Sequence, residues 1–188
     1  MTTVSTSLAE SSGDVTSTGE LPAPGRPASS SPATPSSSSS GSKPATAPYG
    51  SGHGLCFNLN SKLAADAIAR LSPPPAGAGA TWTNPSASND SIQDGCAGVL
   101  SWMSVEWIGI HPGKHILFFA DGVYLGTATA KPHAYTEVTG KTRTTVTVRY
   151  RWPKPQDPLC CPQGGPNDVT FTLSGGAVRA KGEFPPDS

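Results

Sequence analysis

Four cysteines are the residues of this chain whose type and spacing most clearly predict chemistry: Cys56, Cys96, Cys160 and Cys161. An even number of cysteines in a small region rich in Gly and Pro is typical of disulfides in exported proteins. Zinc is the alternative, but the cysteines form no C-x-x-C pair and lack a properly spaced histidine. Because a bond between adjacent Cys160 and Cys161 closes a strained ring, we expect one bridge from Cys56 to this pair and another from Cys96 to its remaining member.

The histidines do not predict a metal site. His111 and His115 are four residues apart, a spacing that can bind a metal on a helix, but Pro112 and Gly113 between them exclude a helix. No carboxylate or thiol ligand is obvious near this pair. His133 follows Lys131-Pro132 in another connection, and we expect it too to be an ordinary loop histidine. The chain also has no Gly-x-Ser-x-Gly nucleophile motif. We therefore assign no catalytic residue, no metal and no cofactor.

Two groups of side chains are candidates for surface binding. Arg149 and Arg151 alternate with Thr145 and Thr147 along one predicted strand, and such a polar stripe can contact phosphate or carboxylate groups. An ordinary solvated sheet face explains the same pattern. Trp82 stands in a polar loop, where it either forms a platform for a ligand or packs beneath the loop.

A glycine-rich segment follows the cysteine pair. The run from 163 to 166, Gln-Gly-Gly-Pro, could present backbone N–H groups to an anion. No helix follows this run, so a tight connection pinned by a disulfide is the alternative that we prefer.

The clearest structural element is a hairpin around Asp121-Gly122, a pair that suits the positive φ angles of a type I′ turn. A two-residue loop pairs Ala120 with Val123 and fixes the register of the strands 116–120 and 123–129. The more apolar face of this hairpin should meet the core. Its residues are Ile116, Phe118, Ala120, Val123, Leu125 and Thr127.

The remaining periodic segments predict a single α+β domain. A helix capped by Asn60 or Ser61 should end before the prolines that begin at Pro73. Strands are expected near 99–108, 135–138, 144–152, 168–173 and 177–180, the last two forming a second hairpin. The expected fold has about five to seven antiparallel strands and one N-terminal helix.

The N-terminal part of the chain has a different composition. Residues 1–50 contain 14 Ser, 7 Thr, 7 Pro, 6 Ala and 5 Gly. Such a segment buries too little apolar surface to fold, so we predict a disordered linker at residues 1–52 and a folded domain at 53–188. The whole chain has 13 basic and 13 acidic side chains, which argues against nucleic-acid binding, and no apolar run long enough for a transmembrane segment.

Several segments of the domain resemble the LppP/LprE lipoproteins of actinobacterial cell envelopes. The resemblance rests on segments that begin with Cys96-Ala97 and continue at 100–102, 117–129, 132–136, 146–152 and 161–166. Its most specific elements are Tyr-Leu-Gly-Thr-Ala-Thr at 124–129 and Tyr-Arg-Trp at 150–152. The resemblance implies an exported protein, lipid-anchored through a cysteine after a signal peptide, with a low-complexity stalk and no established activity.

The start of this chain departs from that family. The residues before Cys56, His53-Gly54-Leu55, do not form a lipobox, and no apolar segment precedes them. We expect a lipid anchor only if a signal and lipobox lie upstream of the chain. The expected location is extracellular or in the cell envelope. The expected function is a non-catalytic binding or structural module whose partner is an envelope protein, a peptide or a glycan; the alternative is an envelope hydrolase with a dispersed site.

Overall fold

The computed structural model describes residues 46–75, 77, 79–109, 112–158 and 160–186. All described residues belong to one compact unit, which begins at Ser42. Most of the predicted linker therefore lies outside the described residues. The segment just before the predicted domain boundary is bonded to it, since the amide of Asn58 donates to the carbonyl of Gly50 over 2.8 Å.

One α-helix, α1 (Lys62–Ala69), precedes the strands, as the sequence predicts. Ser61 caps it, because its Oγ accepts a hydrogen bond from the amide of Ala64 at 3.2 Å. The helix buries Ala64 and Ala67 on one side, and these small residues let it lie close to the sheet beneath.

Antiparallel strands in two sheets make up most of the domain. The first sheet has the order β1-β2-β3-β4, with the short β5 also paired to β3, and the second has the order β6-β7-β8-β9. A single turn of 3₁₀ helix, η1 (Ile92–Asp94), precedes β2. The strands are β1 (Thr83–Ala87), β2 (Ser101–Trp107), β3 (Gly113–Ala120), β4 (Val123–Thr127), β5 (His133–Ala134), β6 (Thr136–Lys141), β7 (Thr145–Trp152), β8 (Gly164–Ser174) and β9 (Ala177–Lys181). The antiparallel α+β fold is thus confirmed, and β1 and β5 are strands that we did not predict.

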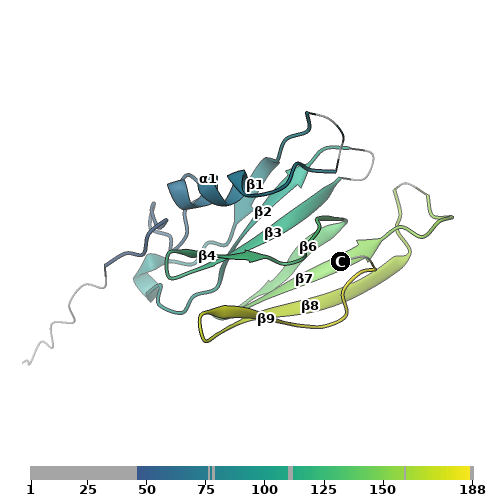
Figure 1. Ribbon diagram of the computed structural model, residues 1–188. Coiled ribbons are helices and arrows are strands. Elements are labelled where there is room, and N and C mark those ends of the chain that lie inside the picture. The colour runs from purple at the N-terminus through teal and green to yellow at the C-terminus, as the bar shows by residue number, and fades with distance from the viewer. Residues whose placement is uncertain (1–45, 76, 78, 110–111, 159, 187–188) are drawn as a thin grey trace, which may run out of the picture. The chain divides into compact units, whose positions relative to one another are not determined.

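The first sheet is the middle of three layers, with α1 on one side and the second sheet on the other (Figure 1). On the helix side Phe57 stacks on Phe119 with ring centroids 4.1 Å apart. On the other side Phe118 of β3 packs against Phe171 of β8 with centroids 4.9 Å apart. Both faces of β3 are therefore buried, whereas the second sheet covers the core with only one face.

The predicted hairpin joins β3 to β4, but its register changes after two residue pairs. Asp121 and Gly122 both have positive φ angles, 49° and 79°, and Ala120 pairs with Val123 as expected. A bulge then shifts the register, so that Phe118 pairs with Gly126, whose φ of 113° suits the bend.

Because of this bulge, our prediction of which β4 residues face the core is wrong beyond the bulge. Thr127 pairs with Leu117, which belongs to the helix-side cluster, and therefore leaves the face on which we had placed it. Ala128 instead joins the cluster between the two sheets, where its amide donates to the carbonyl of Ile116. Counting residues along the strand fails here because one extra residue inverts every later position.

Candidate functional site

The outer face of the second sheet carries four of the five residues predicted for surface binding. In β7, Val146, Val148 and Tyr150 point into the core, so the residues between them point outward. None of the described elements lies over this outer side (Figure 1). The structure therefore places Thr145, Thr147, Arg149 and Arg151 on an uncovered sheet face.

Threonines continue across the strand pair and form two short rows. Thr145 is opposite Thr172 of β8, and Thr147 is opposite Thr170. The hydroxyl oxygens of Thr147 and Thr170 are 3.4 Å apart, a long hydrogen bond. The hydroxyl of Thr145 is already paired, because its Oγ1 lies 2.6 Å from that of Thr142. A threonine hydroxyl can both donate and accept hydrogen bonds, so the rows form a polar surface.

Each threonine row ends at a basic residue of β9. Arg179 is opposite Thr172 and Lys181 is opposite Thr170. Both side chains are exposed, and within the described part of the chain neither forms an ion pair. Sequence analysis missed these residues, although the alternation of β9 placed both on one face and could have pointed to them. We call the six residues Thr145, Thr147, Thr170, Thr172, Arg179 and Lys181 the threonine face.

Arg149 lies beside the threonine face but is already paired. Its Nε and Nη2 each donate to a carboxylate oxygen of Asp168 over 2.8 Å. This hydrogen-bonded pair lowers the pKa of Asp168 and raises that of Arg149. Glu137 is opposite Arg149 on the other side and adds further negative charge. Arg149 is therefore less available to an acidic partner than we predicted.

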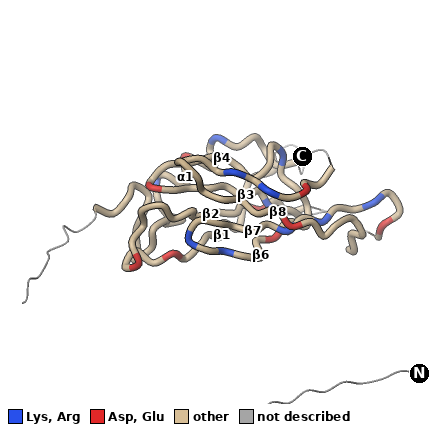
Figure 2. The backbone as a smooth tube through the Cα atoms, turned by 90° about the horizontal axis from the view of Figure 1, so that it is seen from below, with Lys and Arg blue, Asp and Glu red and all other residues tan. Residues whose placement is uncertain are grey.

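Arg151 is exposed at the end of the same strand. Its side chain forms no ion pair with another described residue. Figure 2 shows basic and acidic residues interspersed over the folded unit. Whether a basic side chain is available to an acidic partner therefore depends on whether it already forms an ion pair with a neighbouring acidic residue.

Trp82 is not on the threonine face. It lies on the helix side of the first sheet, partly buried, and its indole N–H donates to the carbonyl of Ser72 at 3.0 Å. Its ring stacks on His115 with centroids 5.8 Å apart and meets Trp107 edge-on at 6.0 Å. The five residues predicted for binding thus belong to two separate surfaces.

The cysteines pair differently from our expectation. Cys56 is bonded to Cys96, and Cys160 to Cys161, so no bridge joins the two pairs. The predicted connectivity is wrong because the segment before α1 lies against the loop before β2, where the amide of Cys56 donates to the carbonyl of Asp90. Sequence separation carried no information about that contact.

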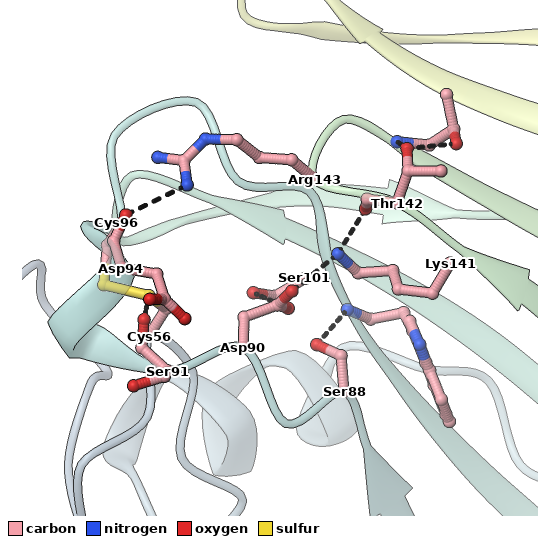
Figure 3. A network of polar contacts seen from close by, with 12 residues as sticks. Cys56, Ser88, Asp90, Ser91, Asp94, Cys96, Ser101, Lys141, Thr142 and Arg143 are labelled. Atoms are coloured by element: carbon pink, nitrogen blue, oxygen red, sulfur yellow. Dashed lines mark hydrogen bonds and ion pairs between the residues drawn. A yellow bond between two sulfur atoms is a disulfide. The ribbon is translucent and has the colours of Figure 1, made fainter.

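The Cys56–Cys96 bridge belongs to a polar network that links the loop before β2 to the β6–β7 turn (Figure 3). Lys141 Nζ lies 2.7 Å from Asp90 Oδ1. The guanidinium of Arg143 donates to the carbonyl oxygens of Asp94, Gly95 and Ala97. These contacts join the loop before β2, in the first sheet, to the β6–β7 turn of the second sheet. The network therefore has a structural role.

The glycine-rich segment has a structural role, and the described histidines are not part of a metal-ligand cluster. Gly164 begins β8, where a Cβ would lie 2.4 Å from the indole nitrogen of Trp152, so this glycine makes room for a ring. His115 is in β3, while His111 lies outside the described residues. Across the described segments, no group of three or more His, Cys, Asp or Glu side chains is placed to hold a metal ion. Nor does this part contain a helix long and apolar enough to cross a membrane.

Comparison with known proteins supports the resemblance found in the sequence. Residues 93–176 match the model of the LppP/LprE lipoprotein family. Proteins named lipoprotein LppP from Mycobacterium bovis and from Mycobacterium tuberculosis are 34% identical over 89 residues, which is 43% of this chain. The chain covers 50% of the length of these relatives. No solved structure matches. The matched region contains β2 to β8 and hence most of both sheets.

Proposed function

Because residues 93–176 carry the domain of the LppP/LprE lipoproteins, we propose that this protein is a non-catalytic binding module of the cell envelope. The threonine face is its binding surface. The family description supports the location, since lipoproteins are attached to membranes. The uncovered second sheet supports the binding role, because its other face and both faces of the first sheet are used for the core.

The observation that carries this proposal is the register of β7, β8 and β9. It places two pairs of threonine hydroxyls in rows that end at the unpaired cations Arg179 and Lys181. Hydroxyl groups bind other hydroxyl groups, and guanidinium and ammonium groups bind acidic oxygens. A partner with hydroxyl and acid groups at regular intervals can therefore bind both the threonine hydroxyls and the two basic side chains. An acidic glycan polymer has this chemistry.

The regular spacing of side chains on this face favours a polymer over a small molecule. Successive residues on one side of a strand are about 7 Å apart and neighbouring strands about 5 Å apart, so the rows offer repeated contacts. Each exposed contact contributes little, and several contacts along one chain add up through avidity. We therefore expect weak binding to single sugars and measurable binding to long chains.

Calorimetric titration with polygalacturonate tests this proposal. We expect saturable binding that weakens as salt is added, and loss of about tenfold or more in affinity for the Arg179→Gln/Lys181→Gln variant. Lys62→Gln is the matched control, because Lys62 is an exposed cation on α1. Its affinity should equal that of the parent.

Two further probes and a hydrolysis assay distinguish this partner from the alternatives. Uncharged dextran should not bind, and vesicles of anionic lipid should bind less tightly than the polymer. Equal loss of affinity in the Lys62→Gln control, or preference for the vesicles, would overturn an acidic glycan as the partner. Release of shortened sugars from the polymer during long incubation would favour a hydrolase instead.

A further inference from the structure

A pocket of about 220 Å³ lies on the opposite side of the domain core from the threonine face. It is formed where the chain leaves α1 and passes over the sheet at β3 and β4. The polar and aromatic residues that line it are Arg70, Ser72, Trp82, His115, Tyr124 and Thr127. The proposed function does not use any of these residues.

His115 supplies a buried polar group to the wall of this pocket. Only 5% of the residue is exposed, and its Nδ1 is buried without a hydrogen-bond partner. Buried polar atoms in proteins nearly always have such a partner. His115 lines the pocket, so a small rotation of its ring would bring this nitrogen to a ligand bound there. Burial, with a smaller effect of His133, lowers the pKa of His115 to about 4. The imidazole is therefore uncharged at neutral pH, and one of its nitrogens accepts a hydrogen bond.

Two aromatic rings give the pocket a fixed shape. Trp82 is held by its hydrogen bond to Ser72 and by its contacts with His115 and Trp107. Tyr124 packs against Phe119 with ring centroids 5.5 Å apart. A pocket whose walls are already in place costs a ligand less to organise.

Arg70 brings positive charge to the rim. Its guanidinium lies 5.9 Å from the centroid of the Tyr124 ring, and no acidic side chain among the described residues forms an ion pair with it. Thr127 adds a hydroxyl that donates to the carbonyl of Thr129, which leaves its oxygen able to accept a further hydrogen bond. The pocket thus combines a cation at the rim with hydroxyl and imidazole groups inside.

We propose that this pocket binds a small hydroxylated carboxylic acid of the size of one sugar-acid ring. The carboxylate pairs with Arg70, and a ligand hydroxyl donates to the imidazole of His115. The volume is below the 300 to 1,000 Å³ typical of pockets for larger ligands, so one ring fills it. This inference is independent of the threonine face.

Nuclear magnetic resonance titration of the whole chain with D-glucuronate tests the proposal. We expect saturable shifts of the Trp82 indole N–H and of the His115 ring, with weaker or no shifts for D-glucose, which lacks the acid, and for acetate, which lacks the ring. Methyl glucuronide distinguishes the two sources of this chemistry. Equal binding means that the pocket accepts the end of a glycan, and binding of the free acid alone means that it accepts a metabolite.

Matched variants locate the contacts. Arg70→Gln should weaken glucuronate binding about tenfold, while Lys62→Gln and the Arg179→Gln/Lys181→Gln variant should bind as the parent does. Because His115 is buried, the fold of His115→Gln is checked first by comparing its spectrum with that of the parent. Arg70→Gln changes an exposed residue and is the decisive variant. Absence of saturable shifts in the parent, or equal affinity in Arg70→Gln, would overturn the proposal.

Discussion

Lys141 and Asp90 form an ion pair that joins the edge of the second sheet to the loop between β1 and β2 of the first sheet, with Nζ and Oδ1 2.7 Å apart. Both side chains are about four-fifths buried, with 21% and 19% exposed. Asp90 also accepts a hydrogen bond from Ser101 Oγ at 3.4 Å. The pair lies within the network around Cys56–Cys96 and Arg143 (Figure 3), so it stabilises the packing of the sheets against each other.

Removing one partner of this pair should destabilise the fold. We expect Lys141→Met to lower the free energy of unfolding by about 2 kcal/mol, because it leaves the Asp90 carboxylate partly buried without its cation. Urea denaturation measures this change. Lys62→Met is the control, since the Lys62–Asp66 pair has the same 2.7 Å separation on an exposed helix face, and it should change stability little. Equal effects of the two variants would contradict the role of the pair.

The Cys56–Cys96 bridge should contribute more than the pair. It closes a loop with a sequence separation of 40, for which chain entropy gives about 4 kcal/mol. We expect Cys56→Ser/Cys96→Ser to lower the midpoint of thermal unfolding strongly, whereas Cys160→Ser/Cys161→Ser, in an exposed loop, should lower it little. Mass spectrometry of the unreduced peptides should find Cys56 linked to Cys96. A linkage between Cys56 and Cys160 or Cys161 would refute this pairing.

The cysteines also show why part of the structure could not be predicted from the sequence. Their number and surroundings predict disulfides, but pairing depends on tertiary contacts between segments far apart in the chain. The hairpin turn was predictable because Asp121 and Gly122 have local conformational preferences that no distant contact overrides. The β3–β4 bulge could not be predicted in this way. Gly126 indicates a bend in the strand, but the sequence does not show which residue is the extra one.

The binding surfaces were predictable to a similar extent. Alternation in β7 correctly predicts which residues face away from the core. It cannot predict that Asp168 neutralises Arg149, because that pairing depends on the register between two strands. The loop that carries Trp82 showed no apolar periodicity, and β1 within it contains Pro85, which suits only an edge strand.

Stability should depend on pH through His115. Its pKa is about 4 in the folded protein and about 6.5 when unfolded, so between these values the unfolded state binds more protons. The protein should therefore lose on the order of 3 kcal/mol of stability as pH falls from about 6.5 to about 4. Urea midpoints across this range test the prediction. The His115→Gln variant should lack this part of the loss, and an identical pH dependence in both proteins would contradict it.

Tyr150 tests how a buried hydroxyl group affects the stability of the core. It is 1% exposed, and its hydroxyl forms no well-aligned hydrogen bond among the described residues. Burial raises the pKa of the phenol, and the nearby Thr129 side chain acts in the opposite direction. Tyr150→Phe removes that hydroxyl without emptying the site, so we expect stability to stay the same or rise by up to about 1 kcal/mol. Tyr150→Leu, which leaves a void between the sheets, is the comparison and should be clearly destabilising. A large loss in Tyr150→Phe would reveal a hydrogen bond that stabilises the core.

The measurement that tests the threonine face most directly is an amide chemical-shift map of the whole chain during addition of polygalacturonate. We predict that the largest shifts fall on Thr145, Thr147, Thr170, Thr172, Arg179 and Lys181, and that Arg179→Gln/Lys181→Gln needs about tenfold or more polymer to reach the same shifts. Shifts concentrated on α1, or an unchanged map in the presence of saturating polymer, would contradict it.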